Sequence, residues 1–140
     1  MDQVALVTGA DRGLGLALSA NLLERGWQVL AGQYLPDWPE LEALAGKYPQ
    51  ALHLLSLDVS LIDSAKAAAR AASQETDHID LLINNAGVTS PQMTQPITEP
   101  QDYAEMHRLF DVNALGPLRV VEAFLRLTRN STLKRMLRLI

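Results

Sequence analysis

Three glycines and two charged residues stand close together near the start of the chain, in the segment Thr8-Gly9-Ala10-Asp11-Arg12-Gly13-Leu14-Gly15. Glycine lets a backbone turn tightly and approach a phosphate, and a helix N-terminus offers unpaired N–H groups with a partial positive charge. If a helix begins here, the segment predicts a site for an anionic diphosphate. The alternative is a glycine turn that serves only the corner between a strand and a helix. A P-loop is excluded, because no Gly-Lys-Ser/Thr follows.

The elements around this segment are predicted from the spacing of apolar residues. Strand-like runs cover residues 4–7, 27–31, 53–59 and 79–83. Helical patterns cover residues 13–25, 40–47, 60 to at least 72, and 101–129. Gly26 is the expected stop of the first helix and Ser60 the expected cap of the third. Strands that alternate with crossover helices predict an α/β protein with a parallel sheet.

The long helix predicted for residues 101–129 carries a seam of apolar residues at spacings of three and four, which we interpret as core packing. Its members are Tyr103, Met106, Phe110, Ala114, Leu118 and Val121. The acids Asp102, Glu105 and Asp111 have no predicted partner and are interpreted as a solvated face. Residues 88–100, just before this helix, contain three prolines and are predicted to form a surface loop.

The composition excludes several classes of function. The 140 residues, 48% of them hydrophobic, predict one domain over residues 1–140 whose core needs neither metal nor disulfide. The absence of cysteine excludes thiol catalysis and favours a reducing compartment, so the expected location is cytoplasmic. The three histidines lack a ligand spacing, so no metal is predicted. A net charge of −4 disfavours nucleic acid, and we find neither a secretory signal nor a membrane-spanning apolar run.

The glycine segment resembles the Thr-Gly-x-x-x-Gly-x-Gly pattern of the short-chain dehydrogenase/reductases. Three further matches to that family follow in order: Asp58-Val59, Asn84-Asn85-Ala86-Gly87 and Asp111-Val112-Asn113. The resemblance extends over essentially the whole chain. It implies a Rossmann-type doubly wound parallel sheet with strand order 3-2-1-4 and a possible short fifth strand at residues 135–140.

The same resemblance implies an oxidoreductase that moves hydride between a nicotinamide dinucleotide and a small carbonyl or alcohol. The residues it implies for binding the dinucleotide are Thr8, Gly9, Asp11, Arg12, Gly13, Leu14, Gly15, Gln33, Asp58, Val59, Asn85, Ala86 and Gly87. Asn113 is the implied catalytic-site residue. Two other functions stay open: a non-catalytic dinucleotide-binding or interaction module, and a truncation product without function.

The charges expected near the adenosine ribose of the dinucleotide favour NADP(H) as the cofactor, with NAD possible. An NAD-preferring site usually has a carboxylate at the end of the second strand, where this chain has Gln33 or Tyr34. Arg12 resembles the arginine with which NADP-binding members of the family hold the 2′-phosphate, a group that a guanidinium binds bidentately. Alternatively, Arg12 pairs with Asp11 or another surface acid, which would leave the preference open.

The chain departs from the family pattern at the catalytic serine and the Tyr-x-x-x-Lys motif. The residues four places after its tyrosines, Tyr34, Tyr48 and Tyr103, are Trp38, Leu52 and His107. The serine would fall at or beyond Ile140, so we interpret the chain as a truncated, cofactor-binding N-terminal half that is inactive alone. The basic tail from Arg126 to Ile140 fits either a frameshift or a basic surface turn. An uncovered strand at the sheet edge predicts self-association.

Asn113 precedes Pro117 by four residues, the spacing of a helical hydrogen bond. Because proline has no N–H, the carbonyl of Asn113 is predicted to be free. In the family the main chain of the corresponding asparagine holds a water of the proton relay, which implies the same use here. The alternative is a helix that breaks at Gly116-Pro117.

Overall fold

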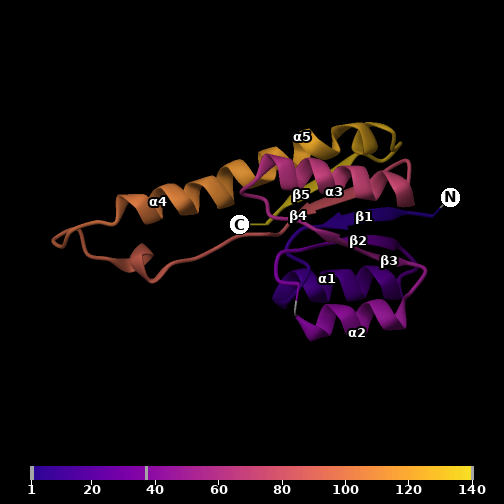
Figure 1. Ribbon diagram of the computed structural model, residues 1–140, viewed down its shortest axis with the longest axis horizontal. Helices are drawn as coiled ribbons and strands as arrows, with labels where there is room; N and C mark the ends of the chain where they lie inside the picture. Colours follow the sequence, from indigo (N-terminus) through magenta and orange to yellow (C-terminus); the bar gives the residue numbers. More distant parts are fainter. Residues whose placement is uncertain (1, 37, 140) are drawn as a thin grey trace.

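A parallel sheet of five strands lies between two helical layers in the computed structural model, which describes residues 2–36 and 38–139 (Figure 1). The strands are β1 (Val4–Val7), β2 (Gln28–Gln33), β3 (Leu52–Ser56), β4 (Leu81–Asn84) and β5 (Arg135–Arg138). Their order, β3-β2-β1-β4-β5, confirms the predicted 3-2-1-4 arrangement and the fifth strand. Residue Ile140, the predicted end of that strand, lies outside the described residues.

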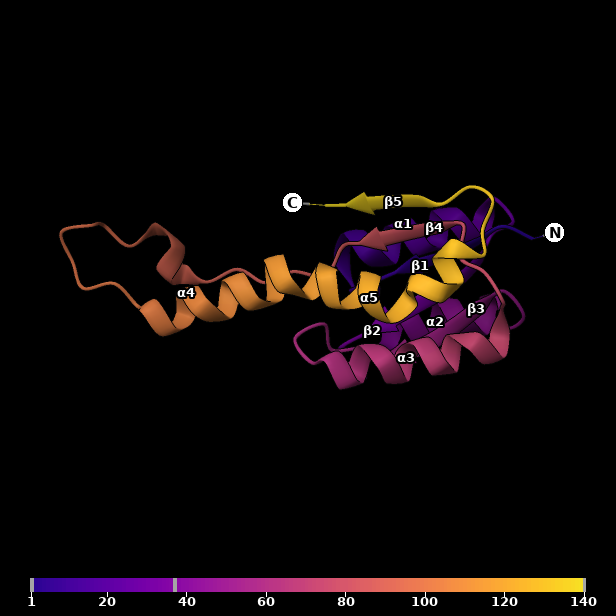
Figure 2. The ribbon, with the colours of Figure 1, turned by 90° about the horizontal axis from the view of Figure 1, so that it is seen from above.

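Helices cover both faces of the sheet, as expected for a doubly wound fold (Figure 2). One layer consists of α1 (Gly13–Glu24) and α2 (Pro39–Lys47), and the other of α3 (Ile62–Glu75) and α5 (Gly116–Arg129). The chain enters α5 from α4 (Tyr103–Phe110) through one π-helical turn, η2 (Asp111–Leu115). The predicted long helix therefore forms, with a wider turn in its middle. Among the described residues, no helix is both long and apolar enough to cross a membrane.

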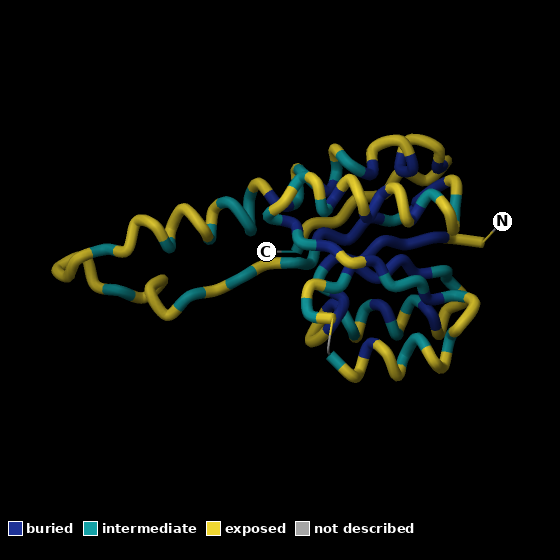
Figure 3. Tube along the Cα trace, in the orientation of Figure 1, coloured by how far each residue is buried: buried dark blue, intermediate teal, exposed yellow. Residues whose placement is uncertain are grey.

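The sheet separates two apolar clusters, which appear in dark blue in Figure 3. Val4 and Leu6 of β1 belong to the cluster under α3 and α5, whereas Val7 belongs to the cluster under α1 and α2. A strand that packs on both faces needs apolar residues at successive positions, and this explains why residues 4–7 show no alternation.

The ends of two helices show one correct prediction and one wrong one. Gly26 has φ +84 and ends α1, with hydrogen bonds from its own N–H to the Leu23 carbonyl and from the Trp27 N–H to the Leu22 carbonyl, both 3.0 Å. The prediction that Ser60 caps α3 is wrong, because α3 begins at Ile62. The Ser60 hydroxyl instead donates to Oδ1 of Asp58 at 2.6 Å. The N–H of Leu61 also donates to the Asp58 carbonyl at 3.1 Å, so residues 58–61 form a turn and the helix begins only after it.

An arm made of residues 88–102 and α4 extends beyond the end of the sheet (Figures 1 and 2), with the short 3₁₀ helix η1 (Pro91–Thr94) in its loop. The interpretation of the apolar seam as core packing is wrong, since Tyr103, Phe110 and Leu118 are 69%, 62% and 62% exposed. Figure 3 shows the arm mostly in the colours of exposed and intermediate residues. Spacing places these side chains on one helix face but does not decide what lies opposite that face.

The acids of this long helix are accessible to solvent, as predicted, and each also has a polar partner. Asp102 caps α4 by accepting the N–H of Glu105 at 3.0 Å. Glu105 accepts two hydrogen bonds from Arg108, at 2.7 and 2.9 Å. The hydrogen bond from Arg108, assisted by one from Ser90, lowers the pKa of Glu105 to about 2. Asp111 pairs with Arg119.

A polar network joins the amino ends of the central strands. Asp80 is buried, and its Oδ2 accepts the N–H of Val4 at 2.9 Å and lies 3.2 Å from Nε2 of His78. Its Oδ1 accepts the hydroxyl of Ser131 at 2.6 Å. Nδ1 of His78 lies 2.7 Å from Oδ1 of Asp77. Both ring nitrogens therefore face acceptors, a setting that suits the protonated imidazole.

We expect the His78 network to make the protein less stable as the pH rises from 6 to 8. The hydrogen bond to Asp77 raises the pKa of His78, with desolvation opposing it. A raised folded-state pKa gives stability that is complete below the unfolded value of about 6.5 and is lost as the pH rises through the folded value. The loss should stay below about 1 kcal/mol, because Asp77 is exposed. Urea unfolding across this range should show a smaller decline for His78→Gln; equal declines would contradict the assignment.

Candidate functional site

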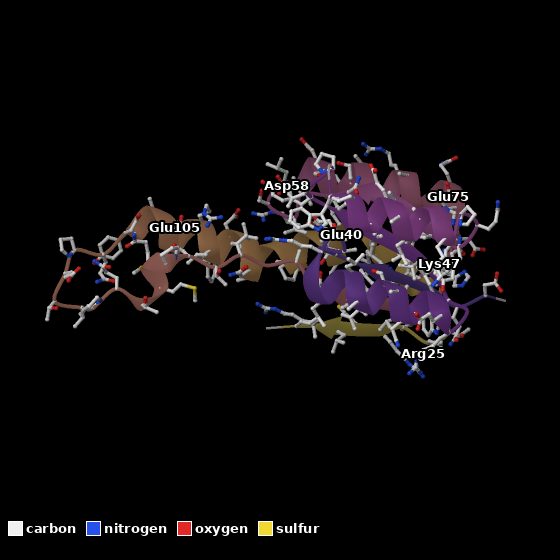
Figure 4. All side chains as sticks on the ribbon, turned by 90° about the horizontal axis from the view of Figure 1, so that it is seen from below. Arg25, Glu40, Lys47, Asp58, Glu75 and Glu105 are labelled. Atoms are coloured by element: carbon white, nitrogen blue, oxygen red, sulfur yellow. The ribbon has the colours of Figure 1, made fainter. Side chains whose placement is uncertain are left out.

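A cavity of about 750 Å³ opens where the strands of the sheet end. Its lining comes from the segments after β1, β2, β3 and β4 and from the α4–η2 junction. In Figure 4, Asp58 marks the end of the body from which the arm extends, whereas Arg25, Lys47 and Glu75 lie at the opposite end. The carboxyl ends of parallel strands, at the point where the strand order reverses, are where open α/β sheets bind ligands. Here that point lies between β1 and β4.

The glycine segment forms the turn from β1 into α1, as predicted. Gly9 and Gly13 line the cavity and have φ +62 and +57, in the left-handed region that favours glycine. Gly15 is buried, and a Cβ there would lie 2.1 Å from the Gly9 carbonyl oxygen. Arg12 occupies the N-cap of α1, and its side chain makes no capping hydrogen bond. The N–H groups of the first turn are therefore available to an anion.

Thr8 and Asn85 hold the ends of β1 and β4 together. The hydroxyl of Thr8 accepts the N–H groups of Asn85 and Ala86, at 3.0 and 2.9 Å. Nδ2 of Asn85 donates to the carbonyls of Thr8 and Gly9, both at 3.1 Å. Asn85 and Ala86 line the cavity, whereas Thr8 is 1% exposed and does not. The structure thus gives Thr8 a supporting position beneath the glycine turn.

Asp11 and Arg12 take different partners. Asp11 is buried and lines the cavity, and its Oδ2 accepts the N–H of Leu35 at 3.0 Å, which fixes the segment after β2. Arg12 is exposed, with its guanidinium over the ring of Trp38 at 5.6 Å from the centroid. Across residues 2–36 and 38–139, Arg12 forms no ion pair, so the alternative pairing with Asp11 is not observed.

The two residues considered for the end of β2 differ in position. Tyr34 lines the cavity. Gln33 does not, and its Oε1 is buried without a hydrogen-bond partner among the described residues. Leu14, another residue expected to bind the dinucleotide, is 58% exposed and also lies outside the lining.

The loop after β3 presents Asp58 and Val59, two of the residues expected to bind the dinucleotide, to the cavity. Oδ1 of Asp58 accepts the backbone N–H of Ser60 at 2.9 Å and also its hydroxyl, so the loop is closed by a local turn. The carbonyl of Val59 accepts Nη1 of Arg119 at 3.0 Å. A Cβ on Gly116 would lie 2.9 Å from Cγ2 of Val59, so glycine permits η2 to approach this loop closely.

Asn113 clamps the segment after β4. Its Oδ1 accepts the N–H of Val88 and its Nδ2 donates to the Val88 carbonyl, both at 2.8 Å. Gly87 and Val88 line the cavity, whereas Asn113 does not. The prediction that the Asn113 carbonyl is free to hold a water is wrong, because Nη2 of Arg138 donates to it at 2.8 Å.

Sequence reasoning missed three lining residues from the α4–η2 junction: Arg108, Asp111 and Val112. The motif Asp111-Val112-Asn113 was recognised only for its asparagine. Its two preceding residues face the cavity instead, and Arg108 lies on the adjacent helical turn. The pairing of Arg108 with Glu105 raises the pKa of Arg108 further above its ordinary value, so Arg108 stays charged and its charge is balanced by the Glu105 carboxylate.

Comparisons with known proteins agree with this geometry. Residues 3–132 match the short chain dehydrogenase family. The chain is 33% identical over 128 residues to sulfoacetaldehyde reductase from Chromohalobacter salexigens, covering 89% of this chain and 48% of the relative. An NADPH-bound carbonyl reductase from chicken fatty liver has a TM-score of 0.81 and 32% identity, with 91% of this chain and 52% of that one covered.

A carbonyl reductase from Pseudomonas aeruginosa PAO1 is 36% identical with a TM-score of 0.77, covering 91% of this chain and 57% of that one. The chain therefore spans about half the length of these similar proteins. The family match covers nearly all of the chain, a range that includes the glycine turn, Asn85 and Asn113. This chain belongs to the short-chain dehydrogenase family.

Proposed function

We propose that this chain binds NADP(H) and forms the cofactor-binding part of an oxidoreductase acting on a carbonyl or secondary alcohol. The observation that carries the proposal is the cavity beside the N-terminus of α1, whose wall is bare backbone at Gly9, Gly13 and Gly87. Backbone without side chains beside unpaired helix N–H groups fits a diphosphate. When bound, the dinucleotide would supply or accept the hydride.

Three features support the choice of NADP(H) over NAD(H). Arg12 is exposed, held over Trp38, and without an ion pair among the described residues. The end of β2 presents Tyr34, not a carboxylate, to the cavity. The similar chicken carbonyl reductase was solved with NADPH. A guanidinium at the ribose end of the cavity is the group that recognises a 2′-phosphate.

Arg12→Ala is expected to weaken NADPH binding by at least about tenfold while changing NADH binding by less than about twofold. The alanine removes a charge-assisted contact to the 2′-phosphate, which NADH lacks. Both affinities are measured by nucleotide fluorescence titration on the full chain. Arg70→Ala is the matched control, because Arg70 is exposed on α3 away from the cavity lining. Equal losses for the two nucleotides would refute the role of Arg12, and failure of the wild-type chain to bind either would refute the function.

A non-catalytic dinucleotide-binding module is the second candidate. It would need only the cavity and its bare backbone at Gly9, Gly13 and Gly87, and no proton-donating residue. Turnover of a small carbonyl with NADPH, tested with the chain alone and with the C-terminal half of a similar reductase added, distinguishes the candidates. Turnover that appears only after addition supports the cofactor-binding part of an enzyme.

The expected self-association stays a prediction. All four residues of β5 are exposed, and β5 is the last strand of the sheet in the described part of the chain. An uncovered strand presents unpaired backbone groups to other chains.

A further inference from the structure

One guanidinium joins two segments of the cavity wall that lie far apart in the sequence. Arg119, in the first turn of α5, donates from Nη1 to the carbonyls of Val59 and Asp111, at 3.0 and 3.2 Å. Its Nη2 pairs with the carboxylate of Asp111. Val59 and Asp111 both line the cavity, whereas Arg119 does not. Arg119 therefore supports this part of the wall from outside the lining.

The two segments depend on this side chain because their backbones do not pair. No backbone–backbone hydrogen bond joins the loop after β3 to η2 in the described part of the chain. Val59 is 7% exposed, and a buried carbonyl without a partner costs free energy, so its contact with Arg119 matters. The carbonyl of Asp111 also accepts the N–H of Gly116 and has lone pairs for both donors.

Gly116 brings the two segments close enough for one side chain to span them. A Cβ there would lie 2.9 Å from Cγ2 of Val59 and 3.4 Å from its carbonyl oxygen, the atom that accepts Arg119. The rigid fork of a guanidinium can donate in two directions at once, which the single ammonium of lysine cannot match. The side chain of Arg119 is 20% exposed, so solvent screens these contacts only in part.

We infer that Arg119 is a positioning residue: it holds the loop after β3 against η2, and so fixes how far apart Val59 and Asp111 stand in the cavity wall. What the cavity binds rests on the proposed function, whereas the contact between the two segments does not. If Arg119 is removed, the loop and η2 can separate, and the cavity changes shape for NADPH and NADH alike.

Arg119→Met is expected to weaken the binding of NADPH and NADH equally, by about tenfold, because charge-assisted hydrogen bonds are lost and the wall relaxes. Arg119→Lys keeps the charge without the fork and should still weaken both by at least about threefold. Fluorescence titration of the full chain measures both affinities, under conditions in which each variant is folded. Arg129→Met is the matched control, an exposed arginine at the end of the same helix and outside the cavity lining, and it should leave both affinities unchanged.

Amide NMR spectra of the nucleotide-free chain test the same role without a nucleotide. The N–H groups of Ser60 and Leu61 close the turn at Asp58, next to the carbonyl that Arg119 holds. Arg119→Met and Arg119→Lys should shift these two resonances, whereas Arg129→Met should not. A role confined to the stability of α5 would leave the loop resonances in place, and that result would overturn the inference.

The remaining outcomes are also decisive. Affinities of Arg119→Lys within about twofold of wild type would overturn the inference, since charge alone would then suffice. A loss confined to NADPH would overturn it by indicating a direct contact with the 2′-phosphate. If Arg119→Met does not fold, Arg119→Lys decides, and failure of both to fold would contradict a positioning role. If the wild-type chain binds neither nucleotide, the proposed function fails, and the loop resonances still decide the role of Arg119.

Discussion

Replacing Gly15 by alanine is expected to abolish NADPH binding at concentrations that saturate the wild-type protein, and to reduce the free energy of unfolding by about 2 kcal/mol. A Cβ at this position would lie 2.1 Å from the Gly9 carbonyl oxygen and 2.6 Å from Nδ2 of Asn85. Neither neighbour can yield easily, because Nδ2 of Asn85 is itself bonded to the Gly9 carbonyl at 3.1 Å. The first turn of α1 must therefore move away from β1, and the glycine turn moves with it.

Gly46→Ala separates this effect from a general cost of alanine. Gly46 lies in α2, and a Cβ there would meet nothing within 4 Å. Alanine in an open helical position should stabilise the protein by up to about 1 kcal/mol and leave NADPH binding unchanged. Binding is followed by fluorescence titration and stability by urea unfolding. Wild-type affinity in Gly15→Ala would show that the diphosphate does not occupy this turn.

Asp80→Ala is expected to give the largest loss of stability, about 3 kcal/mol or more. The carboxylate is 6% exposed and joins three separate segments: the N–H of Val4, the hydroxyl of Ser131 and the ring of His78. Alanine leaves a backbone donor and a hydroxyl without acceptors and an imidazole without one partner. Domains of ordinary stability have a free energy of unfolding of about 5–15 kcal/mol, so this loss would remove between about a fifth and about three fifths of the total.

Asp80→Asn keeps an acceptor and should lose less than the alanine variant. Asp77→Ala is the control, because Asp77 contacts the same histidine but its side chain is 90% exposed, so its loss of stability should be much smaller than that of Asp80→Ala. Asp80 lies at the amino ends of the strands and the cavity at their carboxyl ends, so the folded fraction of each variant should bind NADPH normally. Equal stability of Asp80→Ala and wild type in urea would refute the network's role.

The fold could be predicted because its signals are local and repeated. Continuous apolar residues at 4–7, the glycine stop at Gly26 and alternating strands and helices each follow from neighbouring residues, and all three were confirmed. Strand ends were less accurate, with the predicted run 79–83 observed as β4, Leu81–Asn84. The run of apolar residues begins before the first residue that pairs with a neighbouring strand. An apolar run therefore predicts that a strand exists more accurately than it predicts the first and last residues of that strand.

The sequence predicted the lining residues that belong to a recognised motif. It missed lining residues that come from an element without such a motif. Gly9, Gly13, Asp58 and Gly87, which the sequence predicts to bind the dinucleotide, line the cavity. Arg108 also lines it, but its position depends on how the arm leaves the sheet, which no local pattern encodes.

The sequence by itself determined the glycine turn, the alternation of strands and helices and the lack of a donor at Pro117, since each depends on the chemistry of residues adjacent along the chain. The tertiary structure decided which groups meet: Thr8 with Asn85 across 77 residues and Arg138 with Asn113 across 25. Such pairs form because packing brings distant segments within hydrogen-bond distance. Residue types state what each group can donate or accept, whereas only the folded chain fixes which partner is within reach.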